Sequence, residues 1–166
     1  MQLLIVRHAI AFERNAKRWP DDADRPLSPR GVARARKAAA GLRVIAPHPA
    51  RVLASPLCRT LETAAILAER AGWPTAIACP ELVPGATPET LLQVLRRTPI
   101  KCIALVGHEP GLGRLIAECL SGSAHGRPFE LRKLGAALLQ FPGPVRASGA
   151  QLIWLAPARM LRALAD

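Results

Sequence analysis

The chain has 166 residues, the size of one ordinary domain, and half of them are hydrophobic, so it can bury a core without metals or crosslinks. Its formal net charge is +11, but the basic residues are scattered, and with three Phe, three Trp and no Tyr a base-stacking surface is not expected. We therefore predict a single domain over residues 1–166 with a generally basic surface and no nucleic-acid partner.

The cysteines and the first residues indicate where in the cell the protein is expected. None of the four cysteines forms a C-x-x-C pair, and three lie in apolar stretches, a pattern typical of reduced, buried thiols. The opening apolar run, Leu3–Val6, ends at Arg7 and is too short for a signal peptide or a membrane span. We expect a cytoplasmic protein without membrane association. The Cys and His residues also lack metal-ligand spacing, so no metal or other cofactor is expected.

Strand-like and helix-like segments alternate along the chain. The apolar runs that predict strands are Leu3–Val6, Val52–Ala54, Ala76–Cys79, Cys102–Val106, Ala136–Phe141 and Gln151–Leu155. The patterns that predict helices run from Ser28, as N-cap, to about Val44, over Leu57–Arg70, over Pro88–Arg97 with Thr87 as cap, and over Gly111–Leu120.

This alternation predicts an α/β fold with a mostly parallel sheet and helices on both faces. The last two strands follow each other through Pro142–Gly149, which holds two Gly and two Pro, so we expect an antiparallel hairpin at one edge of the sheet. In sheets of this kind ligands bind beyond the carboxyl ends of the parallel strands.

Polar residues follow three of the predicted strands at that end. The first strand leads into Arg7 and His8, the second into Ser55 with Arg59 one turn further on, and the fourth into His108. A parallel arrangement brings these residues together at the carboxyl ends of the strands. Arginine forks match phosphate oxygens two at a time, and the helix N-termini that follow add free N–H groups. The pattern therefore predicts a phosphoryl-binding site.

Five segments in this order resemble the histidine phosphatase (phosphoglycerate mutase-like) superfamily, and the short branch of SixA-type protein-phosphohistidine phosphatases along nearly the whole chain. The segments are Ile5–Ala9, Asp24–Gly31, Ser55–Ala64, Pro80–Leu82 and Val106–Pro110. One departure is Ala9, which stands where the family usually has glycine, and it puts turnover in question more than phosphate binding.

The resemblance implies a role for each residue of the site. His8 would attack phosphorus through one ring nitrogen and form a phosphohistidine intermediate that water hydrolyses. Arg7, Arg59 and His108 would hold the phosphoryl oxygens, and Arg25 would join them from the loop of residues 9–27. The second ring nitrogen of His8 needs an acceptor, for which a backbone carbonyl is expected.

Two further residues complete the substrate side of the site. Ser55 is expected to orient the helix and its arginine. Glu81 is the candidate proton donor to the leaving group, although nearby cations oppose the raised pKa that an acid needs, and a structural role is an equal alternative.

The sequence thus predicts a metal-independent phosphatase acting on phosphohistidine in a signalling protein, such as a histidine-phosphotransfer domain. Two alternatives remain open. One is a phosphatase or mutase of small phosphate esters in the same superfamily. The other is a phosphate-binding module without turnover, which Ala9 alone favours.

Overall fold

The computed structural model describes residues 1–123 and 129–165. Its strands are β1 (Gln2–Arg7), β2 (Arg51–Ala54), β3 (Ile77–Ala78), β4 (Cys102–Gly107), β5 (Ala136–Gln140) and β6 (Gln151–Ala156). Its α-helices are α1 (Pro29–Ile45), α2 (Cys58–Ala71), α3 (Pro88–Arg96), α4 (Gly111–Ser121) and α5 (Ala158–Ala163). Two short 3-10 helices are η1 (Asp22–Asp24) and η2 (Pro80–Leu82).

The six strands form one sheet in the order β3-β2-β4-β1-β5-β6. The strands β3, β2, β4 and β1 run parallel, whereas β5 is antiparallel to both β1 and β6. This mixed sheet confirms the predicted α/β class and the antiparallel pair at one edge. Four of the five α-helices also follow the predicted ranges to within about two residues, and the short α5 was not anticipated.

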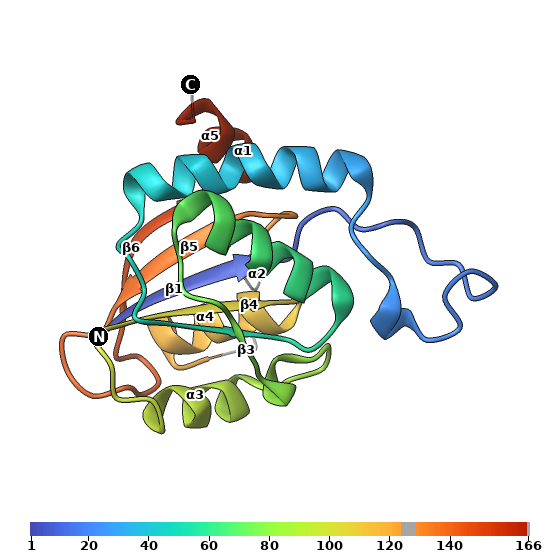
Figure 1. Cartoon of the computed structure of the whole chain (residues 1–166). Coiled ribbons are helices and arrows are strands. Elements are labelled where there is room, and N and C mark those ends of the chain that lie inside the picture. The colour runs from blue at the N-terminus through green and yellow to red at the C-terminus, as the bar shows by residue number, and fades with distance from the viewer. Residues whose placement is uncertain (124–128, 166) are drawn as a thin grey trace.

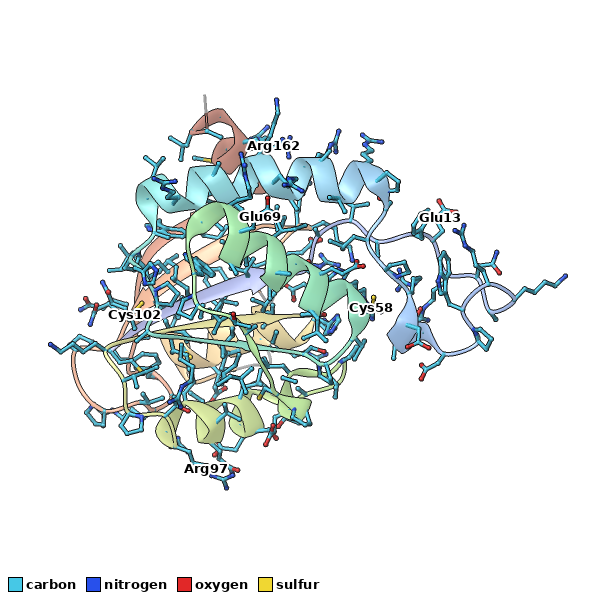
Figure 2. All side chains as sticks on the ribbon, in the orientation of Figure 1. Glu13, Cys58, Glu69, Arg97, Cys102 and Arg162 are labelled. Atoms are coloured by element: carbon cyan, nitrogen blue, oxygen red, sulfur yellow. The ribbon has the colours of Figure 1, made fainter. Side chains whose placement is uncertain are left out.

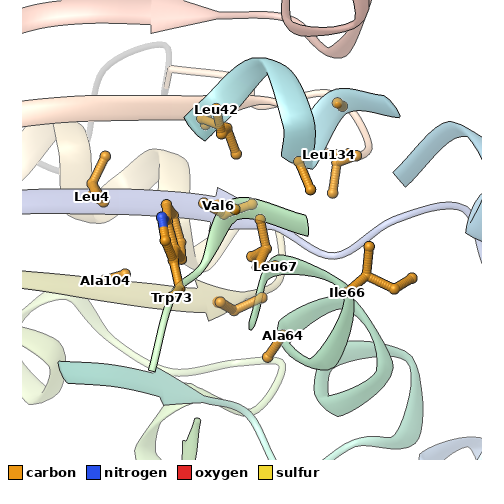
Figure 3. Packing of buried hydrophobic residues seen from close by; sticks show 14 of the residues in the cluster. Leu4, Val6, Leu42, Ala64, Ile66, Leu67, Trp73, Ala104 and Leu134 are labelled. Atoms are coloured by element: carbon orange, nitrogen blue, oxygen red, sulfur yellow. The ribbon is translucent and has the colours of Figure 1, made fainter. Parts of the chain in front are cut away.

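Helices cover both faces of the sheet (Figure 1). The helices α1, α2 and α5 pack on one face, where Leu42, Leu67 and Leu161 join a buried apolar cluster with Leu4 and Val6 of β1. Figure 3 shows this packing from close by, with Trp73 beside the strands. The helices α3 and α4 cover the other face. The central strands are therefore buried on both faces, which is why they read as continuous apolar runs.

Local signals fix where the helices begin and end. The Ser28 hydroxyl accepts from the Gly31 N–H at the start of α1, as predicted, and the Thr87 hydroxyl caps α3 in the same way. Gly72 ends α2 with a positive φ of 72°. None of the helices in the described part of the chain is long and apolar enough to cross a membrane.

One glycine of α1 fixes the loop that reaches the site. At Gly31 a Cβ atom would lie 1.8 Å from the Ile10 carbonyl oxygen. The loop after β1 therefore passes directly against the first turn of α1, where the Ser28 N–H also donates to the Ile10 carbonyl at 3.0 Å. Only glycine permits so close an approach.

Candidate active site

The carboxyl ends of β1, β2 and β4 meet at one edge of the sheet. Arg7 pairs with Gly107 at the last register position of β1 and β4, and the His8 N–H donates to the Gly107 carbonyl at 3.0 Å. The rings of His8 and His108 are tilted, with centroids 5.0 Å apart. Figure 2 places Cys58, at the start of α2, at this end of the molecule and Cys102, the first residue of β4, at the other.

His8 is buried and held in one tautomer. Its Nδ1 lies 2.8 Å from the Ala9 carbonyl oxygen, which can only accept, so the proton sits on Nδ1 and Nε2 carries the free lone pair. Burial first, and then the charge of Lys133, lower the pKa of His8 to about 2. The imidazole is therefore neutral at physiological pH, which is the state that a nucleophile requires.

Lys133 lies beside Nε2 of His8, with its Nζ 3.1 Å from that nitrogen. The turn that presents it is strained: Leu134 is buried and has a φ of 58°, in a region that costs a branched residue roughly 1–2 kcal/mol. The Leu134 N–H is shared between the carbonyls of Arg7 and His8, which ties the turn to the exit of β1. Burial and the charges of neighbouring arginines lower the pKa of Lys133 to about 8.

Arg59 comes from the first turn of α2 and is buried beside these residues. Its Nη1 donates to the Asp22 carbonyl at 2.8 Å and its Nη2 lies 3.3 Å from Asp22 Oδ2. Its Nε–H is buried and has no hydrogen-bond partner in the described part of the chain. A buried donor without a partner is costly, so an oxyanion that reaches this group would relieve that cost.

Arg7 shows the same feature at the end of β1. Its Nη1 donates to the Leu131 carbonyl at 2.7 Å, while its Nε is buried and unpartnered among the described residues. The Leu131 N–H donates in turn to Glu109 Oε1 at 2.8 Å, and the Gly113 N–H donates to Oε2 at 3.0 Å. Glu109 therefore fixes the segment that holds Arg7.

Arg25 joins the cluster from the loop after β1. Its Nε lies 2.7 Å from Asp22 Oδ1, and its Nη1 donates to the Phe12 carbonyl at 2.6 Å. Asp22 thus bridges Arg25 and Arg59, and the hydrogen bond from Arg25 lowers the pKa of Asp22 to about 2. Asp22 is a permanent anion that holds the two guanidinium groups together.

His108 is held by two hydroxyl groups. Its Nε2 lies 2.9 Å from the Oγ of Ser55 and 3.1 Å from the Oγ1 of Thr60, and all three side chains are buried. Burial, with the charges of Arg59 and Lys133, lowers the pKa of His108 to about 3. Ser55 therefore positions His108.

Thr63 links α2 to the exit of β1. Its hydroxyl donates to the Arg59 carbonyl at 2.7 Å and accepts from the Ala9 N–H at 3.0 Å. Ala9 itself is buried, and the only described non-glycine residues with positive φ are Leu134 and Ser148. The backbone at Ala9 therefore needs no glycine.

The cluster gathers four cations, Arg7, Arg25, Arg59 and Lys133, around one carboxylate, Asp22, and two neutral imidazoles. Such an arrangement suits a group that carries two negative charges and several acceptor oxygens. No three His, Cys, Asp or Glu side chains gather as a metal site within residues 1–123 and 129–165.

Known proteins match this chain over most of its length. Residues 3–83 match the model of the histidine phosphatase superfamily (branch 1). An uncharacterised protein of Picosynechococcus sp. (strain ATCC 27264 / PCC 7002 / PR-6) is 34% identical over 138 residues, which are 81% of this chain and 82% of that protein. The chain belongs to the histidine phosphatase superfamily.

Solved structures place this histidine phosphatase among the short, SixA-type members. The protein histidine phosphatase SixA complexed with tungstate aligns with a TM-score of 0.82 and 25% identity, over 97% of this chain and 99% of that one. A mycobacterial glucosyl-3-phosphoglycerate phosphatase aligns with a TM-score of 0.70 over 94% of this chain and 98% of that one. At 18% identity this second likeness shows the fold alone.

Glu81 of this histidine phosphatase makes no direct contact with the cluster in the described ranges. It sits in η2 after β3, which β2 and β4 separate from β1. Its Oε2 accepts from the Cys79 thiol at 3.3 Å, and no contact joins it to the phosphoryl-binding side chains in the described ranges. Hydrogen bonds from its own backbone N–H and from Cys79 keep its pKa below the usual value. Its carboxyl group is therefore ionised.

Three residues of the site were not predicted from the sequence: Lys133, Asp22 and Thr60. Lys133 carried a usable signal, because an antiparallel β5 begins at the edge where β1 ends, so residues just before β5 reach the site. Asp22 lies in a loop without a distinctive pattern. Thr60 follows Arg59 in a helix, where nothing in the pattern marks it as a partner of His108.

Proposed function

We propose that this protein is a phosphatase that removes the phosphoryl group from phosphohistidine in a protein, through a phosphorylated His8. One observation carries the proposal. The lone pair of His8 Nε2 faces Lys133, and in the same cluster the Nε–H groups of Arg7 and Arg59 are buried and unpartnered in the described residues. Donors left free around a neutral nucleophile form a site for a phosphoryl group.

The first step is transfer to the enzyme. The phosphoryl oxygens bind Arg7 and Arg59, and Lys133 moves from His8 Nε2 onto one of the same oxygens. The Nε2 lone pair then attacks phosphorus in line with the leaving nitrogen, and the P–N bond of the substrate breaks. The bonding electrons return to that nitrogen, and the substrate ring, which carries a proton on its other nitrogen, leaves as neutral imidazole. Transferring this group needs little covalent help, so positioning and charge supply most of the acceleration.

The second step returns the enzyme to its starting state. Water attacks the phosphorus of phosphorylated His8, the P–Nε2 bond breaks, and inorganic phosphate leaves. The Ala9 carbonyl keeps the proton on Nδ1 and stabilises the positive charge on the ring while Nε2 carries the phosphoryl group. Both steps use side chains and one backbone carbonyl of this chain, together with the substrate and water.

The leaving group favours phosphohistidine over an alkyl phosphate. An alkoxide needs a proton from a general acid, whereas the pKa of Glu81 is held below its usual value and that of Asp22 is about 2, so both carboxyl groups are ionised. Imidazole leaves with much less help. The likeness in fold to the protein histidine phosphatase SixA supports the same choice.

The alternative of a phosphate-binding module without turnover rested on Ala9. Because the backbone there takes an ordinary conformation and His8 keeps its attacking nitrogen, the substitution gives no reason to expect an inactive site.

The free thiols, three of them buried, support a cytoplasmic location for the protein and its phosphoprotein substrate.

The test is a comparison of substrates with wild-type protein and Glu81→Gln. A phosphorylated histidine-phosphotransfer domain, free phosphohistidine and a panel of alkyl and aryl phosphates are offered, and kcat/KM is measured for each. We expect phosphohistidine to be preferred and Glu81→Gln to lose less than about 30-fold on it, below the ~10²–10⁴-fold range of a lost general acid. Preference for an alkyl phosphate, with a large loss in Glu81→Gln, would identify a phosphatase of small esters instead.

A further inference from the structure

A basic pocket adjoins the active site on the side of α1 and α5. It has a volume of about 830 Å³ and shares Arg7, Ala9 and Lys133 with the site. Beyond them its walls come from α1, from the segment before β5 and from α5, segments that lie far apart in the sequence. This volume is within the range of ligand pockets, about 300–1,000 Å³, and far exceeds what one phosphoryl group needs.

Four arginines line this pocket away from the catalytic cluster: Arg34, Arg132, Arg159 and Arg162. None of the four makes an ion pair or a side-chain hydrogen bond with any residue that the structure describes, whereas the exposed Arg36 and Arg96 pair with Glu69 and Glu89. The only acidic residue of the lining is Glu130. The pocket therefore carries a concentrated positive charge that the protein itself leaves unbalanced.

The positions of these arginines suit an extended ligand that starts at His8. Arg159 and Arg162 lie three residues apart on α5 and so share one face of that helix. Arg34 comes from the second turn of α1, against which α5 packs (Figures 1 and 2). The charge thus continues from the phosphoryl-binding cations along one side of the molecule, over two neighbouring helices.

We propose that this pocket binds acidic residues of the substrate protein close to its phosphohistidine. Charge complementarity selects carboxylates, and a pocket lined by Lys133, which also contacts His8, can bind residues that lie beside the phosphorylated one. The proposal rests on the proposed function, because it assigns the surface around the phosphohistidine of the same substrate. It makes Arg34 and Arg159 specificity residues, outside the reacting cluster.

The test uses two phosphohistidine peptides that are identical except that one has Asp and Glu around the phosphohistidine and the other has Asn and Gln. Wild-type protein is compared with Arg34→Gln/Arg159→Gln. The matched control, Arg43→Gln/Arg51→Gln, removes two charges at the opposite end of the sheet, where Arg51 begins β2. Free phosphohistidine, which has no neighbouring acidic side chains, reports the basal activity.

We expect wild-type protein and the control to prefer the acidic peptide by about tenfold in kcat/KM, and the pocket variant by less than about threefold. All three should hydrolyse free phosphohistidine equally, and salt should reduce the preference. Equal kcat/KM of wild-type protein on the two peptides would overturn the proposal. So would the same loss of preference for the acidic peptide in the control variant. The proposal would also be overturned if hydrolysis of a small bisphosphate required Arg34 and Arg159 while hydrolysis of the acidic peptide did not.

Binding separates this proposal from the proposed function. The acidic peptide without its phosphoryl group, labelled with a fluorophore, is titrated with protein that tungstate has saturated. Weaker binding in the pocket variant alone supports the pocket even if phosphohistidine proves not to be a substrate. Equal binding in all three proteins counts against the pocket even if phosphohistidine is hydrolysed.

Discussion

Replacing Lys133 by Gln tests a residue of the site that lies outside the five segments shared with the family. In the free protein its ammonium group lies 3.1 Å from His8 Nε2, and in the proposed first step it moves to a phosphoryl oxygen. A hydrogen bond to a charged group contributes about 1.5–3 kcal/mol, and losing the contact with His8 returns about 1 kcal/mol, because attack no longer requires breaking it. The net loss of about 0.5–2 kcal/mol predicts a decrease in kcat/KM centred near tenfold.

The assay follows hydrolysis of free phosphohistidine at pH 7.5. Arg132→Gln, which removes the charge of an exposed neighbour, is the matched control and should stay within about threefold of wild type. Lys133→Arg should recover most of the loss, since it keeps the charge. A rate in Lys133→Gln equal to or above that of wild type would refute this reasoning, because Lys133 would then only obstruct the nucleophile.

The pH profile gives the same test with a defined sign. The pKa of Lys133 is lowered to about 8, so its ammonium form, present below that pH, is lost as the pH rises through it. The kcat/KM of wild-type protein should therefore fall above about pH 8, and Lys133→Arg should keep its activity to higher pH. A profile that is flat to pH 10 in both proteins would contradict the assignment.

Two further predictions concern stability and anion binding. The folded-state pKa values of His8 and His108 lie at about 2 and 3, so the unfolded chain takes up protons below pH 6.5 that the native protein does not, and stability must fall with decreasing pH. Urea unfolding should show that the free energy of unfolding falls by up to about 2 kcal/mol per histidine between pH 7 and pH 5. A free energy of unfolding that does not change over this pH range would contradict the lowered pKa values of the two buried histidines. Tungstate should raise the Tm of wild-type protein but not of Arg59→Ala, and an unchanged shift in the variant would place the anion elsewhere.

The sequence was informative where local physics decides the structure. The strands β1, β2 and β4 are short apolar runs with polar residues directly after them, so parallel pairing alone was enough to bring His8, Ser55 and His108 to one edge. Helix starts were predictable for the same reason, since the caps Ser28 and Thr87 act within three residues.

The remaining features of the site depend on contacts between segments that are distant in the sequence. Glu81 follows a strand as the other site residues do, but β3 is the edge strand, and two strands separate it from β1. Lys133 reaches His8 because β5 runs antiparallel to β1 and Leu134 adopts a strained turn. The direction of β5 gave a usable signal, but the turn at Leu134 could not be read from the sequence. The position of Asp22 in the site depends on how the loop after β1 folds back against Arg59.

The central claim is that His8 is the nucleophile, and the most direct measurement is kcat/KM of His8→Ala on phosphohistidine, beside a near-UV circular dichroism spectrum that checks the fold. Water cannot replace a nucleophile whose Nδ1 is held 2.8 Å from the Ala9 carbonyl oxygen and whose Nε2 lies 3.1 Å from Lys133, so we predict a loss of at least ~10³-fold with an unchanged spectrum. Retention of more than about a tenth of the activity by a folded His8→Ala protein would contradict the mechanism, because no such variant can form the phosphohistidine intermediate.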